Sequence, residues 1–400
     1  MANRADQERA LDWFTGPQRA GIVRAALAAL GRPDPEHLLV GVDRVHHRPE
    51  VDTTVLYSLN LTSADPAVAK PELVLIVTTA ALPEGVASFE YDGLTLRTWK
   101  HPDDPRLPAL QAVDDPERLR AWLPSERRDG GARGQLLSYR PLRRAVVRLD
   151  GGGKRYYVKL IRADRAAGLS RRYRLLDAAG LGPVVAGEPE DGVLVAEKVP
   201  GRSLAHALVA WHDNPSALPA PQEVADLLDR MPDGLLALPR RESWAERADF
   251  HGATAAAALP QHAGEIRSIT QHLQRLVADA PTGPVVPTHG DFYEANVFVA
   301  KGHFTRMIDV DAAGPGLRED DLACLLGHLA VLPDLSPSHY PRIVEVTQSW
   351  GAAFEQMVAP AALRARTAGV ILSLVAGTTP AHALARLDLC RAWLYRAESC

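Results

Sequence analysis

The chain has 400 residues, of which 46% are hydrophobic and 24% charged, a balance that is typical of globular proteins and excludes wholesale disorder. At roughly 100–200 residues per domain, this length predicts two or three compact units. The formal net charge of -4 provides no general attraction to nucleic acid or to an anionic membrane. No apolar run approaches the roughly 20 residues that a membrane-spanning helix needs.

The first residues, MANRADQERALDW, lack the apolar region of a signal peptide, so we expect a cytoplasmic protein. The three cysteines are odd in number and have no CxxC spacing. We therefore expect neither a disulfide framework nor a cysteine-based zinc site.

Residues 1–130 have the pattern of a mixed α+β extension. Helical periodicity runs from Gln18 to Gly31, and stretches rich in β-branched residues predict strands over 53–61 and 72–79. An Asp-Gly pair between alternating apolar residues predicts a hairpin over 89–99. A short acidic helix over 114–122 and a linker over 127–134 complete the segment.

Residues 135–203 predict a small lobe of strands around one helix. Strand-like stretches over 136–149 and 155–161 are joined by Asp150–Gly153, a turn that needs the conformational freedom of glycine. A helix follows over 170–180 and a strand over 192–199. From about residue 204 to 400 the pattern is mainly helical and is interrupted only over 285–311. The fold class that we expect is therefore α+β.

The segment THGDFYEANVFV (288–299), followed by MIDVD (307–311), carries the chemistry. Asp291 precedes a strand that begins at Asn296, and Asp309 ends the returning strand, so the three side chains are expected to converge. Asn and Asp oxygens suit Mg²⁺, and a free carboxylate accepts the proton of an attacking hydroxyl. The structural alternative is a polar loop with a capping Asp and a buried Asn.

These residues resemble the catalytic loop, HGDxxxxN, of the aminoglycoside phosphotransferase and choline kinase superfamily, relatives of the protein kinases. The superfamily's metal-binding segment is matched by Ile308-Asp309, two glycines and Asp321-Leu-Ala323. The resemblance implies a bilobal, protein-kinase-like fold that uses ATP and Mg²⁺. By this resemblance Asp291 is the catalytic base, and His289 supports the loop. Asn296 and Asp309 are the Mg²⁺ ligands, and Asp321 braces the loop through buried hydrogen bonds.

The resemblance also assigns residues upstream. Lys159, on a strand after a hairpin, would hold the α- and β-phosphates, and Glu197 to Val199 would form the hinge that binds adenine. The hairpin over 139–146 would cover the phosphates, although it has no Gly-rich signature. Residues 140–174 hold twelve basic residues against two Asp, which fits either a phosphate site or a solvated Arg-rich face.

One feature departs from the superfamily pattern. The superfamily pairs its strand Lys with a Glu on the next helix, but this chain has no Glu between Lys159 and Gly180. Ser or Arg stands where that Glu is expected. Asp164 or Asp177 would be the substitute, or Lys159 would be oriented in another way.

The implied organisation is a cap (1–130), a nucleotide-binding lobe with its hinge (135–203) and a helical lobe with the catalytic loop and acceptor site (204–400). The implied activity is transfer of the ATP γ-phosphate to a hydroxyl of a small molecule: an antibiotic, a sugar or an amino sugar. Two alternatives stay open, namely phosphorylation of Ser or Thr in a natural-product precursor peptide, and a nucleotide-binding pseudokinase that acts as a partner-binding module. Neither nucleic acid nor a membrane is expected as a partner.

Overall fold

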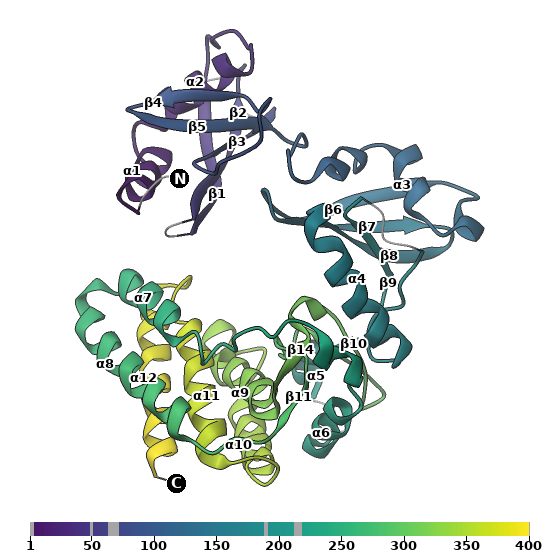
Figure 1. The fold of residues 1–400 in the computed structure, drawn as a ribbon, viewed down its shortest axis with the longest axis vertical. Helices are drawn as coiled ribbons and strands as arrows, with labels where there is room; N and C mark the ends of the chain where they lie inside the picture. The colour runs from purple at the N-terminus through teal and green to yellow at the C-terminus, as the bar shows by residue number, and fades with distance from the viewer. Residues whose placement is uncertain (1–3, 49–50, 63–71, 188–190, 212–217, 400) are drawn as a thin grey trace. The chain divides into compact units, whose positions relative to one another are not determined.

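The computed structural model describes residues 4–48, 51–62, 72–187, 191–211 and 218–399 (Figure 1). The fold is mixed α+β, as the sequence predicts. The chain divides into two compact units. The first comprises residues 1–167 and 186–197, and the second comprises 168–185 and 198–400.

The first unit begins with a five-stranded antiparallel sheet in the order β1-β2-β3-β5-β4. Helices α1 and α2 pack on one face of it, where Val55, Tyr57 and Leu59 point into a shared core. Because strand side chains alternate between faces, Leu56 points to the opposite side, into a second core. The bounds of these elements are α1 Arg4–Thr15, α2 Arg19–Ala29, β1 Leu39–Arg48, β2 Asp52–Asn60, β3 Leu73–Thr78, β4 Ser88–Tyr91 and β5 Leu94–Lys100.

The second core also contains the inner face of a four-stranded antiparallel sheet in the order β6-β7-β8-β9. Residues of the connecting segment, among them Leu107, Leu110 and Leu119, are buried in the same core. The connecting segment thus covers one face of the four-stranded sheet. The elements are η1 Pro108–Ala112, α3 Pro116–Trp122, η2 Ser125–Arg127, β6 Ala132–Arg140, β7 Arg144–Gly151, β8 Lys154–Ile161, α4 Ala163–Ala178 and β9 Val193–Glu197.

The sequence predicted the elements with the clearest local signals. Asp92 and Gly93 both have positive φ between β4 and β5, as a hairpin with an Asp-Gly turn requires. Gly152 and Gly153 do the same between β7 and β8. The predicted linker over 127–134 was wrong at its end, because β6 begins at Ala132 and pairs with Gly151. Strand β1 was missed because none of its residues is fully buried and its exposed and partly buried residues do not alternate.

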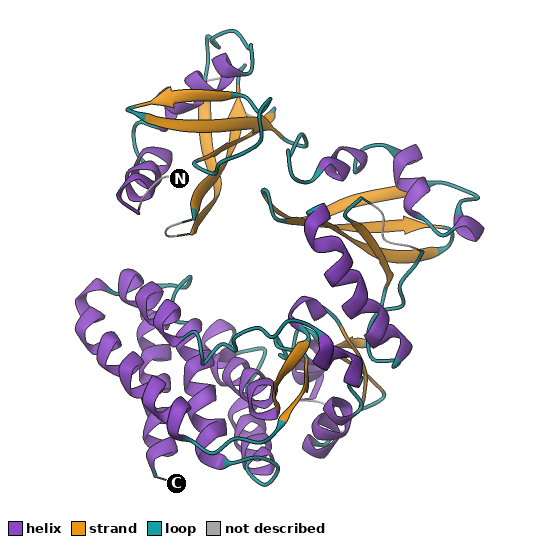
Figure 2. Ribbon diagram, in the orientation of Figure 1, coloured by secondary structure: helices purple, strands orange, loops and turns teal. Residues whose placement is uncertain are grey.

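Helices predominate in the second unit (Figure 2). Among the described residues, no helix has both the length and the apolarity to cross a membrane. The helical elements are α5 Leu204–Trp211, α6 Pro221–Asp229, η4 Asp233–Ala237, α7 Ala248–Ala258, η5 Pro260–His262, α8 Ala263–Asp279, α9 Arg318–Leu335, α10 Ile343–Phe354, α11 Pro360–Ser373 and α12 Pro380–Glu398.

Two small antiparallel sheets interrupt these helices, one in the order β10-β12-β13 and one formed by β11 and β14. The pair β12 and β13 is the hairpin that the sequence predicts around residues 296–308. The pairing of β11 with β14 was not predicted. The strands are β10 Arg202–Ser203, β11 Val285–Thr288, β12 Val297–Ala300, β13 His303–Met307 and β14 Gly314–Leu317.

We expect His251 to make the stability of the second unit dependent on pH. It lies in α7 and is only 6% exposed, and burial is the main reason, with Arg247 second, that its pKa is lowered to about 4. In the unfolded chain this histidine has a pKa of roughly 6.5, so on acidification the unfolded state takes up the proton before the folded state does. The contribution of neutral His251 to the free energy of unfolding is therefore complete above about pH 6.5 and is lost as the pH falls toward 4.

We therefore expect His251→Gln to reduce the acid sensitivity of the protein. Between pH 7 and pH 4, the loss of unfolding free energy should shrink by about 3 kcal/mol. Urea denaturation at both pH values measures this, with His37→Gln, at an exposed position, as the control. Equal pH dependence in the His251 variant and the unaltered protein would contradict the assignment.

Candidate active site

The loop between β11 and β12 is fixed at its start by a buried carboxylate. Asp321, at the first turn of α9, has no exposed surface. Its Oδ2 accepts the backbone N–H of His289 and its Oδ1 accepts that of Gly290, each at 2.8 Å. Burial raises the pKa of Asp321 to about 7, while the two N–H donors act in the opposite direction. The first two residues of the HGD motif are thus held by one side chain.

His289 links this loop to the returning strand. The ring is fully buried, its Nε2 donates to the carbonyl of Ile308 at 3.0 Å, and its Nδ1 accepts the backbone N–H of Asp291 at 3.3 Å. Both bonds fit the tautomer with the proton on Nε2. His289 therefore joins the backbone of Asp291 to the residue that precedes Asp309.

Asn296 closes the loop at its other end. Its Nδ2 donates to the carbonyl of Asp291 at 3.0 Å, and its own carbonyl accepts the N–H of Ile308 at 2.8 Å. Because the amide nitrogen is engaged with Asp291, Oδ1 is the Asn296 atom left to face a ligand. The predicted approach of the three positions is therefore present in the backbone.

Tyr293 reports the electrostatic field of the loop. Burial raises its pKa to about 12, and the next contributions come from the carboxylates of Asp291 and Asp309. The phenol ring stacks on His328 of α9, with centroids 4.3 Å apart. Two of the predicted site carboxylates therefore lie close enough to this half-buried phenol to raise its pKa further.

Asp309 leaves β13 in the left-handed conformation, with φ 55°. The following 3-10 turn, η6 (Val310–Ala312), leads into β14, where Gly314 pairs with Thr288 of β11. This path brings Ala312 against Gly290, where a Cβ would lie 2.9 Å from the Ala312 carbonyl oxygen. Gly290 itself has φ 77°, so both its conformation and its contact favour glycine.

Asn296 and Asp309 have the chemistry of Mg²⁺ ligands, since each supplies a hard oxygen and Mg²⁺ binds through one or two carboxylates plus waters and phosphates. Among the residues that the structure describes, no three His, Cys, Asp or Glu side chains group as a larger metal centre. Asn296 and Asp309 thus offer oxygen donors of the kind that Mg²⁺ takes.

Arg172 was not predicted as part of this region. It stands on α4, the helix that contains no Glu, and it is 7% exposed. Its Nε donates to the carbonyl of Ala313 at 2.7 Å, and a terminal nitrogen donates to the carbonyl of Gly168 at 2.9 Å. Burial lowers the pKa of Arg172, and the charge of Asp311 opposes this. The helix is thus anchored to the segment that follows Asp309.

The two predicted substitutes for the missing Glu have other partners. Asp164 forms a bidentate ion pair with Arg162, at 2.7–2.8 Å, and its side chain is 52% exposed. Asp177 accepts the backbone N–H of Val185 at 3.0 Å. Sequence reasoning had no signal for Arg172, because its acceptor carbonyl lies 141 residues further along the chain.

The upstream residues lie on the four-stranded sheet and just beyond it. Lys159 in β8 pairs with Val146 of β7 and Leu194 of β9. The carboxylate of Glu197 accepts a hydrogen bond from Lys154 at 2.6 Å, and Val199 is buried. Lys159 and Glu197 belong to the first unit, whereas Val199 belongs to the second unit with the catalytic-loop residues.

Glu294 is a buried loop residue that sequence reasoning also missed. It is 6% exposed, and burial raises its pKa to about 7, with the charge of Asp291 adding to the shift. Its carbonyl accepts the N–H of Ala205, which ties the loop to the start of α5. No local pattern distinguishes it from an exposed loop Glu.

A family model for the phosphotransferase enzyme family matches residues 142–355, which is more than half of the chain. No curated protein matches. Solved structures that resemble the chain include a thermostable aminoglycoside phosphotransferase mutant in complex with AMP-PNP and hygromycin B, at 18% identity and TM-score 0.45, covering 66% of this chain and 93% of that one. A choline/ethanolamine kinase family protein from Mesorhizobium loti is 17% identical (TM-score 0.43; 66% and 91% covered). A Plasmodium vivax ethanolamine kinase is 12% identical (TM-score 0.41; 65% and 82% covered).

Gly290→Ala tests the packing of the loop. The new Cβ would require a left-handed alanine and would meet the carbonyl of Ala312, so the unfolding free energy should fall by about 2–3 kcal/mol. Gly180→Ala is the matched control, because Gly180 has φ 70° but nothing within 4 Å of the added Cβ. Chemical denaturation should show the smaller loss, about 1 kcal/mol, for the control. Equal losses would mean that the contact with Ala312 is unimportant.

Arg172→Met tests the anchoring of the segment after Asp309. Removing the guanidinium leaves the buried carbonyl of Ala313 without this donor, which costs about 1–3 kcal/mol. We expect the amides of residues 310–314 to exchange with solvent at least about tenfold faster in hydrogen-exchange mass spectrometry. Arg171→Met, at an exposed position on the same helix, is the control. Unchanged exchange in the Arg172 variant would argue against the anchor.

Proposed function

This chain belongs to the phosphotransferase enzyme family, and from that premise we propose that it transfers the γ-phosphate of ATP to a hydroxyl group of a small molecule. Asp291 is the residue to which we assign the role of catalytic base. It would accept the proton of the acceptor hydroxyl and orient that oxygen toward the phosphate. The acceptor classes we favour are an antibiotic, a sugar or an amino sugar.

The observation that carries the proposal is the hydrogen-bonded frame around Asp291. Its backbone N–H is bonded to His289 and its carbonyl to Asn296, so the residue is held from both sides. Asp321 holds the preceding two residues. Phosphoryl transfer depends mainly on positioning and electrostatic stabilisation, and a carboxylate fixed in this way is suited to both.

We propose that Asn296 and Asp309 hold Mg²⁺ through their side-chain oxygens. When bound, the ion would neutralise negative charge on the nucleotide phosphates. Lys159 would contact the α- and β-phosphates, and the backbone from Glu197 to Val199 would bind adenine. In this assignment residues 135–203 form the nucleotide-binding lobe and 204–400 provide the catalytic loop and acceptor site, with 1–130 as an added cap.

The altered helix position fits this assignment. Helix α4 has no Glu to pair with Lys159, but it carries Arg172, which is bonded to the carbonyl of Ala313. The helix therefore supports the segment that follows Asp309 and does not supply a Glu. We infer that the position of Asp309 depends on this support.

Asp291→Asn tests the proposal directly. Transfer of ³²P from γ-labelled ATP and GTP is measured with Mg²⁺ against aminoglycosides, sugars, amino sugars, choline and Ser/Thr peptides. We expect labelling of one small-molecule class and a loss of turnover of at least about 100-fold in the variant, because the base is removed while nucleotide contacts remain. Asp279→Asn, an exposed position at the end of α8, should retain full activity.

The other outcomes separate the alternatives. Labelling of the peptides alone would move the assignment to a peptide kinase. Tight binding of Mg-nucleotide with no transfer, and full biological activity of Asp291→Asn, would favour a pseudokinase. Absence of nucleotide binding by the unaltered protein would contradict the proposed function.

A further inference from the structure

The hairpin between β6 and β7 turns through a residue that is unusual for its conformation. The turn consists of Pro141, Leu142 and Arg143, closed by a hydrogen bond from the N–H of Arg143 to the carbonyl of Arg140 at 3.1 Å. Leu142 has φ 62° and is 2% exposed. Leu142 is the third of the four residues from Arg140 to Arg143, a position that normally takes glycine because other residues are strained at positive φ. Something outside the hairpin must stabilise this conformation.

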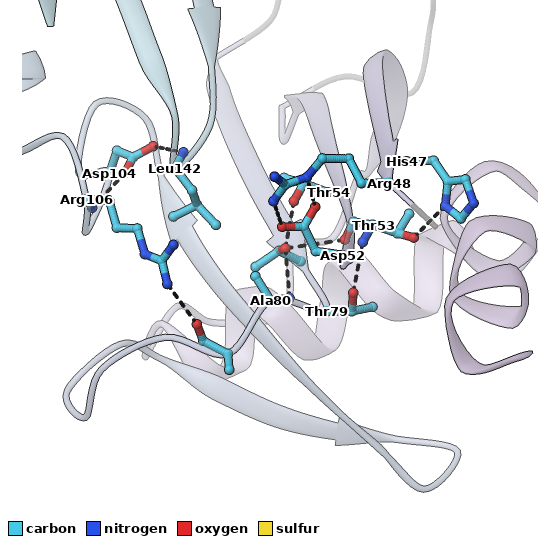
Figure 3. Close-up of polar contacts among 12 residues, drawn as sticks. His47, Arg48, Asp52, Thr53, Thr54, Thr79, Ala80, Asp104, Arg106 and Leu142 are labelled. Atoms are coloured by element: carbon cyan, nitrogen blue, oxygen red, sulfur yellow. Dashed lines mark hydrogen bonds and ion pairs between the residues drawn. The ribbon is translucent and has the colours of Figure 1, made fainter. Parts of the chain in front are cut away.

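That support comes from Asp104, in the segment between β5 and η1 (Figure 3). Its carboxylate is 2% exposed and accepts three hydrogen bonds, each at 2.8 Å. Oδ1 accepts the N–H of Arg106, and Oδ2 accepts both the N–H of Leu142 and the hydroxyl of Tyr139. One buried carboxylate from the N-terminal region thus holds the tip of the hairpin and the last buried residue before it.

The contact continues into the N-terminal sheet. Trp99 of β5 donates from Nε1 to the hydroxyl of Tyr139 at 3.3 Å, and the ring of His101 lies 5.2 Å from that of Tyr139. Leu142 is in one hydrophobic core with Ile76 of β3. The hairpin is therefore packed against the N-terminal region by apolar contacts as well as by hydrogen bonds.

The charges at the tip also face the N-terminal strands. Burial lowers the pKa of Arg143, and the nearby charge of Arg48, at the end of β1, adds to this effect. Asp52, at the start of β2, acts in the opposite direction and forms an ion pair with Arg48. Burial lowers the pKa of His46, and after Arg44 the charges of Arg140 and Arg143 add to this effect, with Asp52 opposing it. The β1–β2 end of the first sheet thus lies close to the basic hairpin tip.

We propose that Asp104 is a positioning residue through which the N-terminal region fixes the nucleotide-covering hairpin in a single conformation. This inference rests on the proposed function, in which that hairpin covers the phosphates of ATP. In a Gly-rich loop, flexibility must be lost when the nucleotide binds, and this loss weakens binding. Here the conformation is fixed beforehand by Asp104, so the nucleotide meets an ordered loop.

Asp104→Asn tests the inference with little change in shape. A carboxylate accepts on both oxygens, whereas an amide presents an NH₂ group on one side, which must face either the N–H of Arg106 or the donors on the hairpin. We expect faster hydrogen exchange at the Leu142 amide, and a KM for ATP and a Kd for a fluorescent ATP analogue that rise roughly five- to tenfold. The kcat should change by less than about twofold, because the catalytic loop lies in the other unit.

Two variants control the experiment. Asp103→Asn alters the neighbouring carboxylate, which is bonded to Gln111 and is 38% exposed, and should leave ATP binding unchanged. Tyr139→Phe removes one bond to Asp104 but leaves the bond to Leu142, so its effect on KM should be smaller than that of Asp104→Asn. Thermal melting of each variant shows whether the fold is retained.

A Leu142 amide that exchanges faster in Asp104→Asn, together with unchanged ATP affinity, would overturn this inference and leave the proposed function intact. Equal losses of kcat and of ATP affinity in a partly unfolded variant would also overturn it, because the role would then be general stability. If the unaltered protein binds no nucleotide, the proposed function fails, and this inference fails with it.

Discussion

The candidate active site depends on the hydrogen bonds that a fully buried carboxylate, Asp321, makes to two consecutive backbone N–H groups. A buried charge is costly unless it is hydrogen-bonded, and unbonded N–H groups are costly as well, so each side of the contact needs the other. The contact sets where the loop leaves β11. From there His289 and Asn296 fix the backbone on either side of Asp291.

A buried aspartate that accepts backbone N–H groups of a loop occurs in both units. Asp104 in the first unit and Asp321 in the second each accept N–H groups from a loop that contains a left-handed residue, Leu142 in one case and Gly290 in the other. A backbone in that conformation turns too sharply for strand or helix hydrogen bonds, so its N–H groups need another acceptor. A side-chain carboxylate provides two oxygens at one point. The two loops that we assign to nucleotide and acceptor chemistry are thus both held by a buried aspartate.

The sequence predicted the elements whose conformation depends on residues that are close together in the chain. The DG and GG turns predicted two hairpins, and the spacing from Asp291 to Asn296 predicted a loop that enters a strand, because conformation over a few residues follows from the residues themselves. Contacts between distant segments gave no such signal. Arg172 and the carbonyl of Ala313 are 141 residues apart, and Asp104 and Leu142 are 38 apart. Strand β1 was missed because it is only partly buried and its burial does not alternate along the strand.

The two departures from the superfamily pattern share a physical explanation. The hairpin lacks glycines and α4 lacks a Glu, and at both places the chain has a buried polar side chain bonded to a distant backbone group. A glycine adopts a left-handed conformation because it has no side chain to oppose it, and it can adopt others as easily. Asp104 instead stabilises one left-handed conformation of a residue, Leu142, that would otherwise disfavour it. A Glu on the helix would bind one side chain, whereas Arg172 binds the backbone of the segment that follows Asp309. In both cases a buried side chain is bonded to a backbone group of a distant segment. Such a contact can hold a loop only if the segment that supplies the side chain is itself well packed. The N-terminal region meets this requirement for the hairpin, because Leu142 and Tyr139 are buried in the same core as Ile76 and Trp99.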